Sequence, residues 1–485
     1  MLLIIFLVPR GAALLVVATP RDQRYLIKLI AAVAGVVTLA LSIAVFIQYD
    51  YGAGGFQFEK EYEWLKGLGI NFHVGVDGIS TPMVLLTGIV MATGVFISWN
   101  IDTRTKDFFV LFLVLVTGVL GTFISLDLFF LFFFYELAVL PMYLLIGVWG
   151  STRKEYGALK LVLYLVASSA LVWIAILVLY VKADMGTFDI TVLSQPEAQG
   201  RFAEAFQRTI FPLFLIGFGV LAGLWPFHTW SPDGHVAAPT AVSMLHAGVL
   251  MKLGAYGIIR VGMTLLPEGA QDWAIPFIIF ATINVVYGAF SAMAQRDLKY
   301  VIGYSSVSHM GYVLMGFATL KVTGVNGAVL QMFSHGVMTA LFFALVGVVY
   351  DRAHTRDISI FQGLAKRMGM TAAFFTLAGL TSLGLPGLSG FISELLVFIG
   401  TFQSYPIVGI FGIIGAAITA VYILRLLARV FFGPLDGRWD KLPDSSKLET
   451  ASMGALGVAI IFVGVYPLPF IRMIESAVKT IPGIT

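Results

Sequence analysis

The chain has 485 residues, of which 59% are hydrophobic and only 12% are charged, with a net charge of +3. Ordinary soluble domains carry about 25% charged residues, so this composition excludes a water-soluble globular protein, and the small net charge gives no indication of a nucleic-acid partner. The chain contains no cysteine, which excludes disulfides and the thiolate ligands of iron–sulfur clusters.

Apolar blocks recur along the chain, each long enough to cross a hydrocarbon core roughly 30 Å thick. They lack the two-residue alternation of barrel strands, so they are predicted to be helices. The first block has no basic stretch before it and no small-residue cleavage site after it, so we expect a retained span rather than a signal peptide. The predicted spans are 2–19, 26–48, 79–99, 108–125, 127–149, 158–181, 209–228, 237–262, 273–293, 299–319, 325–350, 371–400, 405–433 and 450–470.

These spans predict an all-α polytopic membrane protein with about fourteen transmembrane helices in a single domain, 1–485. The longest polar connections, 50–78 and 182–208, are too short to be domains. Alternate connections hold 17 basic residues. The opposite connections and the C-terminus hold only 9, with Arg260 counted among them. Because basic residues favour the cytoplasmic side, both termini are predicted on the outer, periplasmic side of the cell inner membrane.

Glycine and proline interrupt two of the predicted spans. The seventh is broken at 223–226 (GLWP), and the twelfth, five spans later, at 384–387 (GLPG). Because five is odd, two five-helix units repeated at that interval must insert with opposite topology, which is the inverted-repeat plan of secondary transporters. We expect a first repeat over 108–262 and a second over 273–433, with a conduction path between the two broken helices.

Ionisable side chains fall inside these spans, where an unpaired charge costs several kcal/mol. Glu136 lies about ten residues from either end of its span, too deep to reach the headgroups. A carboxyl group in a low dielectric beside a mobile cation can load and release protons, so Glu136 is our first candidate proton carrier. A lipid-facing or structural acid is the alternative. The basic residues inside spans are Arg10, Lys160, Lys252 and Arg425.

Lys252 is the only lysine in the middle of a span, and a buried ammonium group exchanges protons readily. Its alternative role is a fixed partner for a carboxylate. Glu394 follows the break at 384–387, where unwound backbone makes room for water, so it is expected either to deliver protons or to fix the broken helix. Lys160, near a span end, could instead extend its ammonium group to the interface.

Four of the seven histidines, His228, His246, His309 and His335, lie in or near spans. Histidine titrates closest to physiological pH, so each is a candidate proton relay, with a structural hydrogen bond as the alternative. No two of them have His-x-x-x-His or HExxH spacing, and cysteine is absent, so we expect no metal site.

Four stretches carry a family resemblance: 228–240 (HTWSPDGHVAAPT), 247–252 (AGVLMK), 304–311 (YSSVSHMG) and 385–394 (LPGLSGFISE). Over nearly its whole length the chain resembles the antiporter-like membrane subunits of respiratory complex I, NADH:quinone oxidoreductase, specifically chain M, or subunit 4. The resemblance implies a subunit of a proton-translocating enzyme, with no redox centre or cofactor on this chain. It also implies chains of the L and N type as partners in the bilayer and, indirectly, the NADH and quinone modules.

The same resemblance suggests roles for individual residues. Glu136 is similar to the family's glutamate on the fifth helix and Lys252 to its central lysine on the eighth. The axis histidines would be His309 and His335, and Glu394 is similar to the terminal glutamate on the twelfth helix. A glutamate at this last position favours chain M over chain L, where lysine is typical.

One position departs from the family pattern. The seventh helix usually carries a lysine that pairs with the fifth-helix glutamate, and Leu221 stands in its place. His246 occupies a position where an aliphatic residue is expected, so we hypothesise that it supplies the missing cation for Glu136. His246 and Lys252 are six residues apart, about 9 Å along a helix, so both reach Glu136 only if the helix unwinds or water bridges them.

The predicted function is proton translocation coupled to quinone reduction elsewhere in the assembly. Three alternatives remain open: a subunit of a multi-chain cation/proton antiporter, the equivalent subunit of a membrane-bound hydrogenase or photosynthetic ferredoxin-using complex, and a purely structural scaffold.

Overall fold

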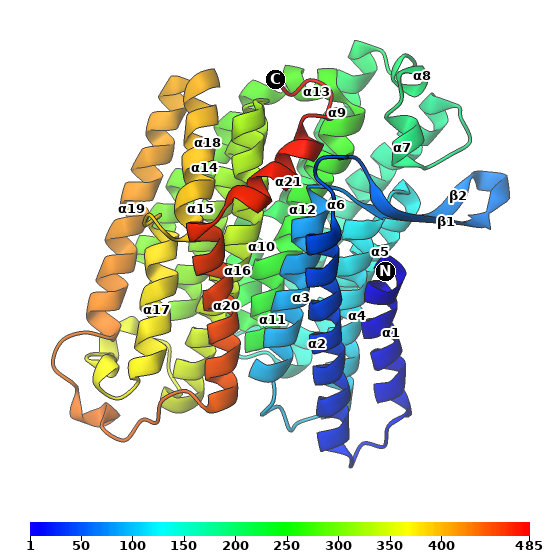
Figure 1. The fold of residues 1–485 in the computed structure, drawn as a ribbon. Coiled ribbons are helices and arrows are strands. Elements are labelled where there is room, and N and C mark those ends of the chain that lie inside the picture. Colours follow the sequence, from blue (N-terminus) through cyan, green and yellow to red (C-terminus); the bar gives the residue numbers. More distant parts are fainter.

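Long apolar helices run alternately up and down and pack side by side through most of the structure (Figure 1). The computed structural model describes residues 1–485. Eleven helical segments are long and apolar enough to cross a membrane, and two shorter helices, Leu2–Ala18 and Gly369–Ser382, are also apolar. The chain is therefore a largely helical, multi-span membrane protein, as the hydropathy pattern predicts.

The first half of the chain supplies the N-terminal helices and the first broken helix. Asp127 begins one of them, because its side chain accepts hydrogen bonds from the backbone N–H groups of Phe129 and Phe130. The helices are α1 (Leu2–Ala18), α2 (Arg24–Gln48), α3 (Ser80–Ile97), α4 (Thr105–Ile124), α5 (Leu128–Trp149), α6 (Lys154–Ala183), α7 (Ile190–Leu193), α8 (Pro196–Gln199), α9 (Glu204–Ala222), α10 (Trp230–Ala237), α11 (Thr240–Leu245) and α12 (Met251–Gly257).

The second half repeats the pattern of long helices and ends on a short amphipathic one. Asp297 starts its helix as Asp127 does, and Ser446 and Glu449 form a capping box at another. The helices are α13 (Pro267–Asp272), α14 (Ala274–Ala294), α15 (Leu298–Ala318), α16 (Val322–Ala353), α17 (Gly369–Ser382), α18 (Ser389–Ser404), α19 (Pro406–Val430), α20 (Lys447–Val465) and α21 (Leu468–Val478).

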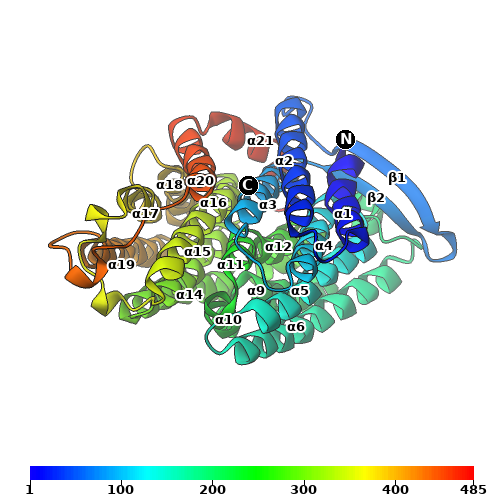
Figure 2. The same ribbon diagram turned by 90° about the horizontal axis from the view of Figure 1, so that it is seen from below.

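The centre of the bundle differs from its rim. The most apolar stretch of α16 and that of 240–263 are completely buried, whereas only 33% of the corresponding stretch of α19 and 39% of those of α2 and α6 is covered. Seen along the helix axes, α11, α12 and α16 lie inside, and α2, α6 and α19 lie at the edge (Figure 2). Because the rim helices expose apolar side chains, the bundle fits a hydrocarbon surrounding rather than water.

The two predicted helix breaks occur at the same kind of backbone. Gly223 ends α9 at φ = +81°, and Gly384, after α17, has φ = +72°. This left-handed region favours glycine, which explains its presence at both points. After each break the N–H of the next leucine bonds five residues back, Leu224 to Gly219 and Leu385 to Leu380. Beyond the first break the chain turns into α10, so this broken helix extends further than the predicted 209–228.

The polar connection 50–78 contains a β-hairpin, so the all-α prediction is wrong in this segment. Strands β1 (Gln57–Leu65) and β2 (Ile70–Val76) pair antiparallel and project from the bundle at the end that carries α7 and α8 (Figure 1). The segment was too polar to be read as a span, and the alternation in β2 is too short to stand out. Beyond the hairpin, Leu126 donates its backbone N–H to His73, which ties β2 to the start of α5.

Carboxylates on both sides of His73 fasten the hairpin. Its Nδ1 lies 2.7 Å from Asp189 Oδ2, and its Nε2 lies 3.2 Å from Glu59 Oε2. The hydrogen bond to Asp189, with the neighbouring carboxylates, raises the pKa of His73 above its ordinary value although burial alone would lower it. Charged imidazole therefore stabilises the docked hairpin.

This arrangement predicts a pH-dependent hairpin. Because the folded-state pKa of His73 is raised, its contribution is complete below the ordinary histidine pKa and is lost as pH rises through the folded-state value. We expect amide-exchange protection factors over 57–76 to fall as pH rises above the ordinary histidine pKa and through the raised folded-state value. In His73→Gln the protection should be lower and independent of pH over that range. Wild-type protection that does not change with pH would contradict the prediction.

Candidate functional site

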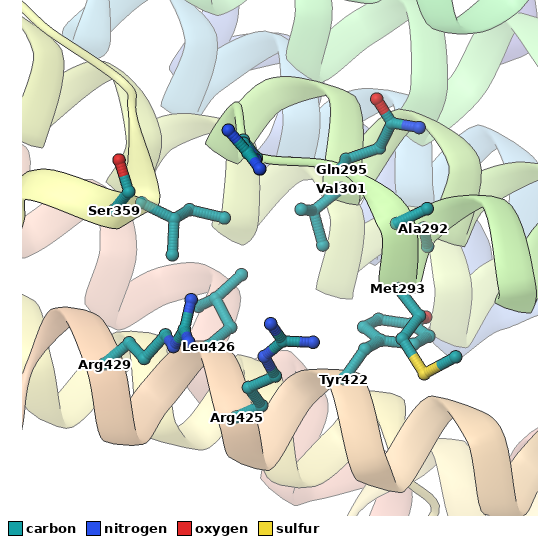
Figure 3. Close-up of a pocket in the computed structure, with 12 residues that line it drawn as sticks. Ala292, Met293, Gln295, Val301, Ser359, Tyr422, Arg425, Leu426 and Arg429 are labelled. Atoms are coloured by element: carbon teal, nitrogen blue, oxygen red, sulfur yellow. The ribbon is translucent and has the colours of Figure 1, made fainter.

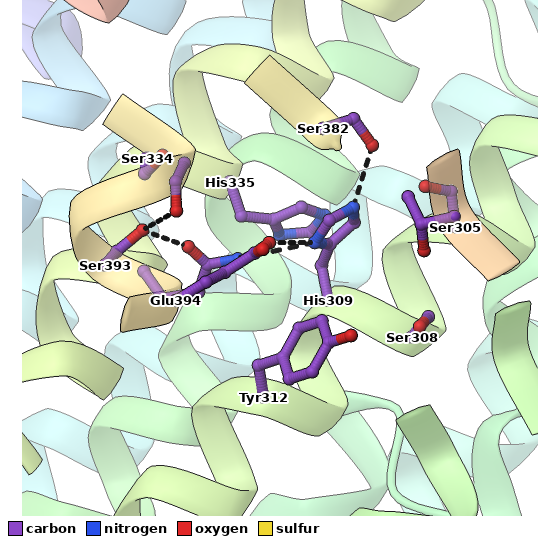
Figure 4. Close-up of polar contacts among 12 residues, drawn as sticks. Ser305, Ser308, His309, Tyr312, Ser334, His335, Ser382, Ser393 and Glu394 are labelled. Atoms are coloured by element: carbon purple, nitrogen blue, oxygen red, sulfur yellow. Dashed lines mark hydrogen bonds and ion pairs between the residues drawn. The ribbon is translucent and has the colours of Figure 1, made fainter. Parts of the chain in front are cut away.

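Buried titratable side chains gather between α15, α16 and α18 (Figure 4). His309 comes from α15 and His335 from α16, and Glu394 lies on α18, shortly after the second break. The histidines are each 1% exposed and the glutamate 4%. In such a place a polar group is costly unless it has partners, so the contacts among these side chains decide what they can do.

His309 is placed between a carboxylate and a hydroxyl group. Its Nδ1 lies 3.2 Å from Glu394 Oε1, and its Nε2 lies 2.9 Å from the hydroxyl of Ser382 at the end of α17 (Figure 4). Gln331 of α16 donates from Nε2 to the same carboxylate at 3.4 Å, and its own carbonyl accepts from Ser393. The imidazole can therefore take or release a proton at either ring nitrogen.

Lys252 extends this group toward the first half of the chain. The side chain is completely buried in α12, and its Nζ donates to the carbonyl of Ala247 and lies 2.9 Å from His335 Nδ1. The rings of His335 and His309 stack with centroids 5.4 Å apart. Lys252, His335, His309 and Glu394 thus form one continuous buried row, which we call the central row. Sequence reasoning singled out all four residues.

The helix that carries Lys252 is irregular. Turns of π-helix occupy His246–Leu250 and Ile258–Met263, on either side of α12. Such turns are rare and frequently mark functional sites, because they widen the helix and rotate the following side chains. The sequence gives no local signal for them.

Glu136 lies apart from the central row. It is partly buried on α5, three residues after Phe133 and four before Leu140, which are 47% and 57% exposed. Residues at this spacing share one helix face, so Glu136 lies near the outer surface of this chain. Its Oε1 has no hydrogen-bond partner, and no cationic group lies within 4.0 Å of the carboxylate.

His246 does not form the expected direct pair with Glu136. Its ring is completely buried against that of His235, with centroids 4.1 Å apart, and against Trp230 at 5.2 Å. Both ring nitrogens of His246 and Nδ1 of His235 lack hydrogen-bond partners, while His235 Nε2 lies 3.0 Å from the Ser231 hydroxyl. The cause is geometric: the π-turn begins at His246, and its ring faces α10 rather than α5.

His235 is a residue that the sequence reasoning missed. His235 belongs to the 228–240 motif and lies between two predicted spans, so it was not a candidate. In the structure it is completely buried in α10. Its spacing of four residues from Ser231, which places the two on one helix face, was the available signal.

The remaining candidates, Lys160 and His228, lie in a separate cluster. Lys160 Nζ is 2.7 Å from Asp233 Oδ2, and the Tyr300 hydroxyl donates to the other oxygen of this carboxylate at 3.0 Å. His228 is 2% exposed, with both ring nitrogens unpartnered and its ring 5.0 Å from that of Tyr287. No hydrogen bond or ion pair joins either residue to the central row.

Leu221 is fully buried where α9 and α12 approach closely. A methyl group added to Gly254 of α12 would lie 2.4 Å from the Phe218 carbonyl oxygen and 2.5 Å from the Ala222 nitrogen. Glycine is therefore required for this contact, and apolar packing occupies the position where the resemblance leads one to expect a lysine.

Several buried cations were not recognised from the sequence, Arg260 and Lys299 among them. Arg260, assigned to a connection, is 4% exposed and forms an ion pair with Asp77, a residue 183 positions away. Lys299 is also 4% exposed, and its Nζ donates to the Ala238 carbonyl at 2.6 Å. Both residues lie close to predicted span edges, where hydropathy does not separate buried from solvated charge.

Residues 125–419 match the model of the family described as "NADH:quinone oxidoreductase/Mrp antiporter, TM". The chain belongs to this family. It is 38% identical to NAD(P)H-quinone oxidoreductase chain 4-2 of Synechocystis sp. over 92% of this chain and 80% of the relative. It is also 38% identical to NADH-quinone oxidoreductase subunit M of Rhodobacter capsulatus, over 91% and 87% of the two chains.

Two solved structures share the fold of this chain. A chain of respiratory complex I from Thermus thermophilus superposes with a TM-score of 0.90 at 24% identity over 100% of both chains. A chain of the Mrp complex from Dietzia sp. gives 0.85 at 18% identity, over 99% of this chain and 96% of the other. At these identities the likeness concerns the antiporter-like fold, which holds the central row inside the helix bundle.

Proposed function

We propose that this antiporter-like chain is a proton-translocating membrane subunit of an NADH:quinone oxidoreductase, complex I, of the chain 4 or subunit M type. The central row carries the proposal, because four titratable groups in mutual contact inside a membrane bundle provide a path for protons. The names of the Synechocystis and Rhodobacter relatives give the kind of assembly.

The contacts of the central row suggest how a proton moves. A proton on Lys252 Nζ passes to His335 Nδ1 over 2.9 Å, and His335 then releases one from Nε2, which has no protein partner. A water molecule at the edges of the two stacked rings carries that proton to His309, which delivers it to Glu394 at 3.2 Å. Quinone reduction elsewhere in the assembly provides the free energy for this proton transfer by changing the charge at one end of the row.

The other candidate residues take places beside this path. Glu136, on the outer face of α5, is suited to sense charge in a neighbouring chain. His246 and His235 form a buried pair that packs against Trp230 of α10 and joins the row through no hydrogen bond. Lys160 and His228, in their own cluster, line the path by which protons enter from one membrane surface.

We infer fourteen spans arranged as two inverted repeats, 108–262 and 273–433. The eleven long apolar segments, α1, α15 and the α17–α18 pair make up this count. Repetition is supported by Asp127 and Asp297, which cap α5 and α15 and form isolated β-bridges with Asp189 and Asp357. The matching backbone at the two helix breaks supports it as well.

Charge distribution supports an orientation with both termini on the periplasmic side of the inner membrane. The basic connections would then face the cytoplasm. The proposed partners are chains of the L and N type on either side, in the bilayer, and indirectly the NADH and quinone modules. We assign no cofactor or metal to this chain, since the residues of the central row are occupied with one another.

A second candidate is a subunit of a multi-chain cation/proton antiporter. The fold is compatible with it, since a chain of the Mrp complex superposes with a TM-score of 0.85, but the complex I chain superposes with a higher score of 0.90. The genes beside this one distinguish the two readings, because NADH and quinone modules would accompany a complex I subunit and antiporter subunits an Mrp-type chain.

Substitution of Glu136 tests the proposed function. In the assembled complex, reconstituted in vesicles, we expect Glu136→Gln to lower both proton uptake and coupled quinone reductase activity without loss of assembly. The amide keeps the shape of the side chain and removes its ability to carry charge. Glu155→Gln, an exposed change at the start of α6, is the matched control. Unchanged proton uptake in Glu136→Gln would contradict the role of this residue.

A further inference from the structure

Three arginines converge on one cavity of about 510 Å³ at the end of the bundle where α14 and α19 finish (Figure 3). Arg425 and Arg429 come from the last turns of α19, and Arg296 lies in the short connection between α14 and α15. Residues four apart share a helix face, so the two arginines of α19 point to the same space. The central row contributes nothing to this cavity.

The three guanidinium groups have no partners within the chain. None of them donates a hydrogen bond to the protein or lies within 4.0 Å of a carboxylate. Asp297 is the neighbour of Arg296 in sequence, but its carboxylate is 3.1 Å from Arg356 Nε. All three residues are exposed, and like charges around one cavity repel one another, so a bound anion stabilises the arrangement.

The rest of the cavity wall is mixed. Met293, Val301, Ile358 and Leu426 are apolar, whereas Gln295, Ser359 and the hydroxyl end of Tyr422 are polar. A free anion would use only the polar part of this wall, whereas a phosphate attached to hydrocarbon also contacts the apolar part. Arginine binds phosphate through paired N–H groups, which fits several guanidinium groups around one headgroup.

The seam between α14 and α19 carries a second cavity farther along the two helices. Its volume is about 450 Å³, and it is lined by Ile283 and Val286 of α14 and by Val408 and Phe411 of α19. Val286 and Met293 are seven residues apart, about two helical turns, so the two cavities lie on one face of α14. Phe290, between them on this face, is 50% exposed, so other helices of this chain leave the face uncovered.

We propose that Arg296, Arg425 and Arg429 bind the headgroup of an acidic phospholipid whose acyl chains lie along the α14–α19 seam. Charge complementarity selects the headgroup, and the apolar cavity on the same face of the seam selects a lipid over a soluble phosphate. The site is independent of proton transfer, and it holds whether or not the central row conducts.

Lipid binding to the purified, delipidated complex tests the site. Fluorescent phosphatidylglycerol is titrated in detergent, with fluorescent phosphatidylcholine as the comparison. We expect the double variant Arg425→Gln/Arg429→Gln to weaken phosphatidylglycerol binding roughly 30-fold and to leave phosphatidylcholine binding unchanged. Arg296→Gln, a change outside the helices, should also weaken phosphatidylglycerol binding. This variant tests the site if the double variant fails to assemble.

The matched control is Arg24→Gln, which removes one charge from the same end of the bundle at the start of α2 (Figure 1). An equal loss of phosphatidylglycerol binding in this control would overturn the proposal, because it would indicate a general charge effect. Displacement of the lipid by excess inorganic phosphate would also overturn it, since the cavity would then be a site for free anions. A disulfide cross-link from Arg296→Cys to a neighbouring subunit would show that a protein chain fills the cavity instead.

Discussion

Lys252→Ala is expected to lower proton translocation by the assembled complex at least about tenfold, since a positioned proton-transfer group contributes roughly 100-fold or more. Lys252 joins the central row to the first half of the chain, because its Nζ lies 2.9 Å from His335 Nδ1. Alanine removes the titratable group and leaves His335 Nδ1 without a partner. Coupled quinone reductase activity should fall with proton uptake, because the two processes are linked in such an enzyme.

Assembly should survive this change. A buried ammonium group bears a desolvation penalty that its removal relieves, so the folded bundle does not depend on it. Lys66→Ala, at an exposed lysine, is the control that should behave as wild type. His246→Leu tests whether the neighbouring histidine pair contributes to the row. We expect this variant to lower proton translocation less than Lys252→Ala does. The measurements are proton uptake into vesicles and quinone reductase activity with and without an uncoupler. Full uptake in an assembled Lys252→Ala complex would contradict the proposed path.

The helices were predictable because hydropathy and helix-breaking residues act locally. Blocks of apolar residues gave the spans, and the GLWP and GLPG sequences gave both breaks, since glycine alone adopts their backbone easily. The β-hairpin and the π-turns beside Lys252 were missed, because neither has a pattern that distinguishes it from a loop or an ordinary helix. Their shapes depend on packing against distant elements.

The sequence could identify the candidate site residues by their type, but it could not show which of them are in contact. A lysine or glutamate deep in an apolar helix is noticeable in any sequence, which is how Lys252 and Glu394 were found. Which groups meet depends on positions far apart along the chain, such as Arg260 with Asp77 or Arg296 with Arg425. For the same reason the sequence could not show that His246 faces His235, because helix rotation decides it.

Glu394→Gln is expected to block proton release from the row while the local structure remains. Glutamine has the shape of glutamate, and its carbonyl can still accept from Gln331 Nε2, which lies 3.4 Å from Glu394 Oε1. It cannot take a proton from His309, whose Nδ1 is 3.2 Å from the carboxylate. The expected result is a fall in proton uptake of at least about tenfold, comparable to that of Lys252→Ala. Glu475→Gln removes an exposed carboxylate that pairs with Lys479, so it controls for loss of negative charge. If the Glu394→Gln complex pumped normally, like the control, His309 would have to release its proton toward Ser382. The row would then end at α17 rather than α18.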